Sequence, residues 1–294
     1  MAAALSAAVQ AAASLSASIS AVVAEARAAD VASPPPGYKL VWSDEFDYEG
    51  LPAPAKWDYE EGYVRNREAQ FYTRARKENA RVENGMLVIE ARKEHFQKPT
   101  ARAGRRDSAS AKPSADYAEY TAASLITLGR ASWQFGRIEV RAKLPQGQGV
   151  WPAIWMLGDN IRKIGWPACG EIDIMEFVGH TPNKVHGTVH YRKDGQHKSS
   201  GGALTVTEPW ADFHVYAVEW TSERMDFFFD QQKYHSVDVK TADDQSQNPF
   251  RQPQYLLINF ALGGSWGGKI DDSVLPQKYL IDYVRVYQKD GVQP

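Results

Sequence analysis

The sequence predicts an all-β fold, a sandwich of two antiparallel sheets. Short apolar and aromatic runs of strand length recur along the chain between turn residues, and no long helical period is present. With 294 residues, 43% of them hydrophobic, the chain can bury the core of one such domain.

The clearest strand covers residues 137–144, where charged and apolar side chains alternate. This pattern is typical of a half-buried antiparallel strand. Further strands are expected at 86–91, 215–220, 225–229, 255–261 and 279–287. Residues 230–232 predict a hairpin turn and the glycine-rich residues 263–268 a flexible loop.

Residues 1–30 differ in composition from the rest, being rich in Ala and Ser with no charge before Glu25. An apolar run and the motif Ala26-Arg27-Ala28 favour a signal peptide, although a positive n-region is missing. The alternatives are a misassigned start or a disordered Ala-rich leader. We expect a Pro-rich linker at 31–37, one domain at 38–294, and a secreted protein, either extracellular or periplasmic.

Composition and charge limit the classes of molecule that the protein is expected to bind. The net charge of −2 lacks the basic excess of a nucleic-acid-binding protein, and no apolar run reaches the roughly 18 residues of a membrane span. We expect a monomer that binds neither nucleic acid nor membrane. A single cysteine, Cys169, excludes an intramolecular disulfide, and we interpret it as a buried residue rather than a nucleophile.

Residues 97–116 are expected to form a loop, because they carry no strand pattern. The segment holds five basic and two acidic residues, which could attract an acidic or sulfated glycan. The alternative is a solvated, disordered insertion.

The most informative segment is 170–177, Gly-Glu-Ile-Asp-Ile-Met-Glu-Phe, which places three carboxylates in an otherwise apolar strand. Side-chain alternation puts Glu171 and Asp173 on one face. Strict parity would bury Glu176 in the core at high cost, so we predict a β-bulge near Met175 that returns it to the acidic face. The alternative is an acidic strand that faces solvent.

Retaining glycosidases use two carboxyl groups about 5 to 5.5 Å apart. A third acid between these two groups would raise the pKa of the proton donor. Three tryptophans, Trp151, Trp155 and Trp166, precede the acids. Because indole faces stack on sugar rings, this context predicts a carbohydrate cleft.

Ordered sequence blocks then reveal a resemblance. They are Leu-Val-Trp-Ser-Asp-Glu-Phe at 40–46, Phe-Gly-Arg-Ile-Glu-Val-Arg-Ala-Lys-Leu-Pro at 135–145, Trp-Pro-Ala-Ile-Trp at 151–155, Gly-Glu-Ile-Asp-Ile-Met-Glu at 170–176, Gly-Thr-Val-His-Tyr at 187–191, Phe-His-Val-Tyr at 213–216 and Asp-Tyr-Val-Arg-Val-Tyr at 282–287. Over about residues 38–289 the chain resembles glycoside hydrolase family 16, within it most closely the bacterial laminarinase-type endo-β-1,3-glucanases.

The resemblance implies a β-jelly-roll with a concave, cleft-bearing face. It also implies Glu171 as nucleophile, Asp173 as its helper and Glu176 as general acid/base, in a double displacement through a covalent glycosyl-enzyme that requires no cofactor. The extra residue in the acidic motif, Met175, favours the laminarinase-like branch over the lichenase and xyloglucan-acting branches.

For substrate binding, the family pattern implies subsites on the nonreducing side at Trp151, Trp155 and Trp166, each of which could instead be core. His190 matches the family's histidine near the cleaved bond, and Asn66 and Trp266 are expected to line the cleft. The segment 66–72 departs from the commoner family form with consecutive asparagines. His186 and His190 have a spacing that suggests zinc, but no third ligand follows, so a catalytic metal is not expected.

Family members often hold a structural calcium ion on the convex side, and the matching positions are Glu45, Gly85 and Asp282. Taken together, the sequence predicts a secreted retaining endo-glycosidase that hydrolyses β-1,3-glucan, with mixed-linkage β-1,3-1,4-glucan as a second substrate. The alternatives are a galactan hydrolase of the agar or carrageenan type on the same scaffold, and a glucan-binding protein without catalysis.

Overall fold

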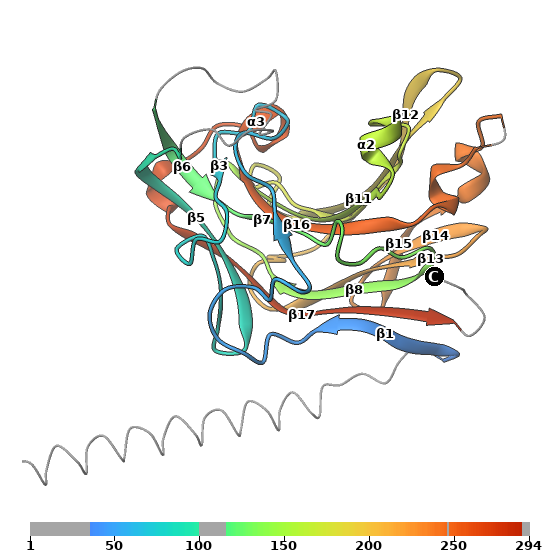
Figure 1. Cartoon of the computed structure of the whole chain (residues 1–294), viewed down its shortest axis with the longest axis horizontal. Helices are drawn as coiled ribbons and strands as arrows, with labels where there is room; N and C mark the ends of the chain where they lie inside the picture. The colour runs from blue at the N-terminus through green and yellow to red at the C-terminus, as the bar shows by residue number, and fades with distance from the viewer. Residues whose placement is uncertain (1–35, 100–115, 246, 290–294) are drawn as a thin grey trace, which may run out of the picture. The chain divides into compact units, whose positions relative to one another are not determined.

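A computed structural model describes residues 36–99, 116–245 and 247–289 (Figure 1). The predicted leader, most of the predicted linker and residues 100–115 of the basic segment lie outside the described residues. None of the described helices is long and apolar enough to cross a membrane.

The domain is a two-layer β-sandwich of the jelly-roll type, which confirms the predicted fold class (Figure 1). The ten-stranded sheet contains β1 (Tyr38–Asp44), β3 (Phe71–Tyr72), β4 (Ala80–Glu83), β5 (Met86–Gln97), β6 (Tyr117–Ala122), β8 (Gly136–Lys143), β13 (His214–Trp220), β14 (Arg224–Phe229), β15 (Gln232–Asp238) and β17 (Gln277–Lys289). Its strand order is β15-β14-β13-β8-β17-β5-β6-β3, with β1 paired to β17 and β4 to β5.

The seven-stranded sheet carries the acidic motif. Its strands, in spatial order, are β12 (Gln196–Thr205), β11 (Lys184–Lys193), β10 (Glu171–Glu176), β9 (Val150–Gly158), β16 (Gln254–Leu262), β7 (Ser124–Ile126) and β2 (Asp58–Tyr59). Within the described residues the helical elements are single turns: α2 (Ile161–Ile164), α3 (Gly264–Gly267), η1 (Val239–Ala242), η2 (Pro249–Arg251) and η3 (Asp272–Val274).

The core lies between the sheets and is built from one face of each. Alternate residues of β9, such as Ile154 and Met156, join Ile172 of β10 and Ile138 and Val140 of β8 in one buried cluster. The other face of β9 is also covered, because Trp155 packs into a second apolar cluster. Strand β9 is therefore buried on both faces, and β10 beside it is held between two long neighbours.

The structure departs from the sequence prediction at β8, whose charged row is more buried than a half-buried strand requires. Arg137 and Glu139 are both shielded from solvent, and Arg137 Nε donates to Glu139 Oε2 at 2.9 Å. Arg137 also bonds Glu219 of β13, and Tyr283 of β17 donates to Glu139. Neighbouring strands supply partners for these charges, so burial leaves neither one unpaired.

The glycine-rich segment predicted as a loop forms one helical turn, α3, instead. Gly264 has a positive φ of 74°, and a Cβ there would lie 2.9 Å from the backbone oxygen of Asn66. Glycine thus allows α3 to approach the segment before β3 closely. This packing places Trp266 of α3 against Trp151 of β9, with ring centroids 5.6 Å apart.

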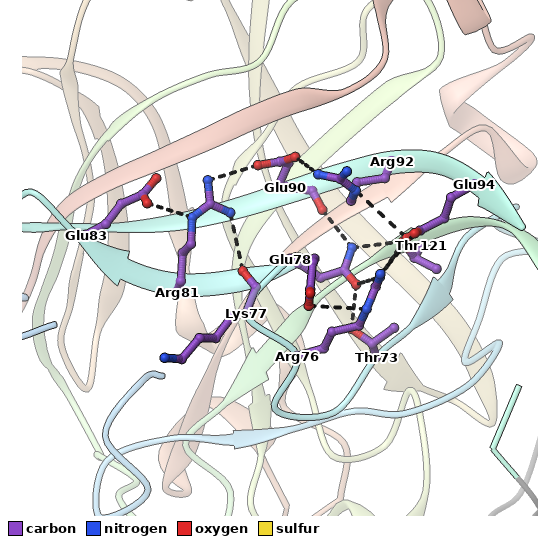
Figure 2. Close-up of polar contacts among 11 residues, drawn as sticks. Thr73, Arg76, Lys77, Glu78, Arg81, Glu83, Glu90, Arg92, Glu94 and Thr121 are labelled. Atoms are coloured by element: carbon purple, nitrogen blue, oxygen red, sulfur yellow. Dashed lines mark hydrogen bonds and ion pairs between the residues drawn. The ribbon is translucent and has the colours of Figure 1, made fainter. Parts of the chain in front are cut away.

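A network of arginines and glutamates joins β4, β5 and β6 (Figure 2). Glu90 of β5 is 4% exposed and accepts from Arg81 at 3.0 Å and from Arg92. Arg76, in the turn that follows β3, makes a two-pronged ion pair with Glu94 of β5. The network fixes the turn that leads out of the segment carrying Asn66.

We expect Glu90→Ala to lower the free energy of unfolding by roughly 2 to 3 kcal/mol, because it leaves two arginines without their buried partner. The side chains of Arg81 and Arg92 are 18% and 35% exposed, which moderates the loss. Glu83→Ala is the matched control, since Glu83 pairs with Arg81 from a position 34% exposed and should cost less than about 1 kcal/mol. Urea unfolding of both variants measures the difference, and equal losses would contradict the assignment.

Candidate active site

The three carboxylates of β10 lie on one face because the strand is bulged. Against β9, Asp173 pairs with Trp155 but Met175 pairs with Ile154, so β10 contains one extra residue between them. The predicted bulge near Met175 is therefore present. Against β11, the three acids pair with alternate residues, His190, Thr188 and His186. Ile172, Ile174 and Met175 point into the core.

Glu171 is held by two nitrogen-bearing rings. Trp166 Nε1 donates to Glu171 Oε2 at 2.8 Å, and His190 Nε2 lies 4.0 Å from Oε1. Burial raises the pKa of Glu171, whereas His190 and the Trp166 hydrogen bond oppose that rise. The two rings thus favour the ionised form, which is the form a nucleophile needs.

Asp173 lies between the two glutamates and is 3% exposed. Burial raises its pKa well above the usual range, and the charge of Glu171 raises it further. The two carboxyl groups also hydrogen-bond to each other, which favours the ion at Glu171 and the acid at Asp173. The shared proton is therefore held on Asp173, which donates a hydrogen bond to the Glu171 carboxylate.

Glu176 has the environment of a proton donor. Burial raises its pKa well above the usual range, followed by the charges of Asp173 and Glu171. Its one opposing hydrogen bond comes from Trp151, whose Nε1 donates to Glu176 Oε1 at 3.0 Å. A carboxyl group kept protonated near neutral pH can act as a general acid.

The predicted aromatic residues differ in how much they face solvent. Trp166 is 50% exposed, whereas Trp151 is 7% and Trp155 is 5% exposed. The ring of Trp155 is covered by the guanidinium of Arg65 at 4.7 Å, and its Nε1 donates to Asn259 at 2.7 Å. In this structure Trp166 alone of the three presents an open indole face, and the sugar contacts of all three stay predictions.

Trp266 and Asn66 lie at the Glu176 end of the face. The ring of Trp266 contacts Trp151 and lies 5.0 Å from the ring of His186, which pairs across the sheet with Glu176. Asn66, in a left-handed conformation, donates its side-chain amide to Glu68 and accepts from Ser265 beside Trp266.

Sequence reasoning missed a polar network that supports the face from the β16 side. Asn259 Nδ2 donates to the Tyr72 hydroxyl at 2.9 Å, and that hydroxyl donates to Glu68 at 3.1 Å. Arg65 lies in the same region and packs on Trp155. A usable signal existed in the sequence: Asn259 interrupts the apolar strand Tyr-Leu-Leu-Ile-Asn-Phe-Ala-Leu, where a buried amide needs a partner.

A pocket of about 470 Å³ is lined in part by residues close to Trp166 in the sequence, but Glu171, Asp173 and Glu176 are not among its lining residues. Its lining includes Ile164 and Ala168, which flank Trp166, and Asn248 and Arg251 around η2. Because this pocket lacks the three acids of β10, we assign the reaction to the acidic face of β10 and not to the pocket.

The structure places the histidines considered as zinc ligands and the single cysteine, Cys169. The described cluster with metal-ligand geometry is Glu171, Asp173 and His190, with ligand atoms within 4.8 Å of one another; His186 is not in it. Cys169 is fully buried, and burial raises the pKa of its thiol to about 11, so it is not poised as a nucleophile.

Two of the three residues predicted for calcium, Glu45 and Asp282, carry carboxylates that bind arginines. Arg285 holds both carboxylate oxygens of Glu45, and Arg141 donates to Asp282 at 2.7 Å. A calcium ion there would draw on the backbone carbonyl oxygens of Glu45 and Gly85, donors that suit this hard cation, and would share the Asp282 carboxylate with Arg141; the calcium site stays a prediction.

Comparison with known proteins shows the family of the chain. The family model of glycosyl hydrolases family 16 matches residues 67–285. The chain belongs to this family. A beta-glucanase of Rhodothermus marinus is 46% identical over 272 residues, which cover 88% of each protein.

Two solved structures of family members are also similar. The laminarinase from Rhodothermus marinus matches with a TM-score of 0.72 and 46% identity, over 86% of this chain and 98% of that one. A non-specific endo-β-1,3(4)-glucanase of the family, co-crystallised with 1,3-β-D-cellotriosyl-glucose, matches with a TM-score of 0.77 and 42% identity, over 87% and 97% of the two chains.

We expect Trp151→Phe to raise the pKa of Glu176, because the indole N–H stabilises the carboxylate and its loss favours the acid. Carbon-13 NMR titration of side-chain-labelled glutamate measures the change, with Glu176→Gln assigning the resonance. Trp155→Phe is the control, since that N–H bonds Asn259 and not an acid. A Glu176 pKa that falls or stays constant in Trp151→Phe would contradict the role of this hydrogen bond.

Proposed function

We propose that this family 16 protein is a retaining endo-β-1,3-glucanase. The observation that carries the proposal is the bulged strand β10, which gathers three acids on one face and gives each a different set of partners. The relatives, a beta-glucanase, a laminarinase and an endo-β-1,3(4)-glucanase, support β-1,3-linked glucan as the substrate class.

In the first step, the ionised Glu171 attacks the anomeric carbon while Glu176 gives its proton to the leaving oxygen. The Glu171–carbon bond forms as the glycosidic bond breaks, and the product is a covalent glycosyl-enzyme. In the second step Glu176, now a carboxylate, removes a proton from water, which attacks the same carbon and releases Glu171. Two inversions give net retention.

The neighbouring side chains have separate tasks in this cycle. Asp173 keeps its proton and donates a hydrogen bond to Glu171, which stabilises the ionised nucleophile before attack and orients its carboxylate. Trp151 orients Glu176 through the 3.0 Å hydrogen bond. Trp166, with its open indole face and its bond to Glu171, is suited to stack on a sugar on the nonreducing side.

The finer points are further proposals. The substrate range includes mixed-linkage β-1,3-1,4-glucan, a proposal supported by the similarity to a non-specific endo-β-1,3(4)-glucanase. The protein is secreted and acts as a monomer, and any calcium bound through Glu45, Gly85 and Asp282 is structural and takes no part in the reaction.

The test of substrate class is a reducing-sugar assay against laminarin, barley mixed-linkage glucan, agarose and κ-carrageenan, with Glu171→Gln as the control. We expect laminarin hydrolysis by the wild type, reduced by roughly four orders of magnitude in Glu171→Gln, because the amide cannot form the covalent bond. Binding of laminarin to the variant should persist. Activity on a galactan alone would move the assignment to an agar- or carrageenan-type hydrolase, and binding without any hydrolysis to a glucan-binding protein.

We expect Glu176→Ala to be rescued in part by sodium azide, because a small anion replaces water in the second step without needing a general base. The product should be a β-glycosyl azide, identified by its anomeric proton coupling in NMR. Glu171→Ala provides the control for stereochemistry, since without the first displacement azide should give the α-anomer. An α-glycosyl azide from Glu176→Ala would contradict retention.

A further inference from the structure

Two histidines on adjacent strands are in direct contact beside the acids. His190 Nδ1 of β11 lies 2.9 Å from His197 Nε2 of β12, and the rings stack with centroids 5.1 Å apart at an angle of 23°. In the strand register His190 is opposite Ser199, so His197 reaches it diagonally from two residues along β12.

The other nitrogen of His190 faces the acids. His190 Nε2 lies 3.2 Å from Asp173 Oδ2 and 4.0 Å from Glu171 Oε1. Asp173 Oδ2 is buried and has no hydrogen-bond partner among the described residues, so the 3.2 Å approach of His190 Nε2 is an electrostatic contact. Because carboxyl oxygens accept and the Asp173 proton is used toward Glu171, a favourable contact requires a hydrogen on Nε2 of His190.

The contact with His197 is what fixes that hydrogen. A neutral imidazole has one N–H, so a hydrogen on Nε2 makes Nδ1 of His190 an acceptor, and His197 must donate. A protonated His190 has a hydrogen on both nitrogens, and His197 must then accept. Imidazole can do either by changing tautomer, and it therefore matches His190 in both charge states.

We propose that His197 is a positioning residue for hydrolysis: it holds the ring of His190 with a hydrogen on Nε2, the nitrogen that lies beside Asp173 and Glu171. The inference rests on the proposed function of these two acids. His197 acts through His190 and makes no hydrogen bond to an acid itself.

Two further observations agree with this role. The pKa of His197 is lowered, by partial desolvation of its ring first and then by His190, which favours the neutral form of His197. The charged groups that face the pair are Glu171 and Asp173, with Glu176 acting on His190 over a longer distance. The His197 ring also lies 4.8 Å from the ring of Trp166, the donor to Glu171.

Two variants separate the hydrogen bond from the ring contact. His197→Phe keeps an aromatic ring beside Trp166 but can neither donate nor accept. His197→Gln loses the ring, but its amide can donate through nitrogen or accept through oxygen. His197 is exposed on a polar strand, so both variants should fold as the wild type does.

We expect kcat on laminarin to fall about tenfold in His197→Phe, the effect of losing one hydrogen bond that orients the catalytic cluster, and to recover most of that loss in His197→Gln. KM should change little in His197→Phe, because the ring beside Trp166 is retained. Wild-type kcat in His197→Phe, or equal losses in both variants, would overturn the proposal.

Nitrogen-15 NMR of labelled histidine tests the same inference without activity. The wild type and His197→Gln should show His190 with its hydrogen on Nε2, and His197→Phe should show a mixture of tautomers; His190→Gln assigns the signals. An unchanged tautomer in His197→Phe would refute the positioning role. If the chain failed to cleave any glucan, the tautomer of His190 would still show whether His197 positions it. A failure of the positioning role is therefore distinguishable from a failure of the proposed glucanase function.

Discussion

The site depends on how three carboxylates are held on one short strand. Moving a charge out of water costs several kcal/mol unless partners replace the lost hydration, and β10 carries three acids within six residues. The bulge between Asp173 and Met175 solves the geometric half of this problem by turning Glu176 back to the acidic face. The electrostatic cost of burying the three carboxylates is reduced by a proton shared between two of them and by N–H donors from neighbouring elements.

Those donors explain why tryptophan recurs around the motif. An indole has an N–H that can bond an acid without adding a full charge, and its ring excludes water. Trp166 supplies this to Glu171 and Trp151 supplies it to Glu176. Arginine in the same positions would lower the pKa of both glutamates and leave the site without a protonated acid at neutral pH. Trp166, which is half exposed, and Trp151, which is buried, therefore orient and tune the acids, a role that sugar stacking alone does not describe.

The sequence predicted those features that depend on local pattern. The alternation of apolar and polar residues predicts strands, and the cost of burying a carboxylate predicts the bulge in β10. Features that depend on contacts across the fold were not predictable in the same way. The sequence predicts a loop where the structure has the helical turn α3. This turn depends on Gly264 packing against the backbone of Asn66, a contact between segments far apart in the sequence. His197 carries no signal in its own neighbourhood, since its partner belongs to another strand and lies diagonally across the register.

The two sides of the acidic face are built differently, which bears on how the protein can diversify. On the β16 side, Asn259, Tyr72 and Glu68 form a buried chain of hydrogen bonds, and the turn beyond Tyr72 is tied down by the arginine network of Figure 2. A change there leaves a buried polar group without a partner. On the β12 side, Trp166 and His197 are exposed, and their contacts are few. Substitutions there alter how the acids meet a sugar at little cost in stability, so the exposed side is where a change in substrate preference is physically easiest.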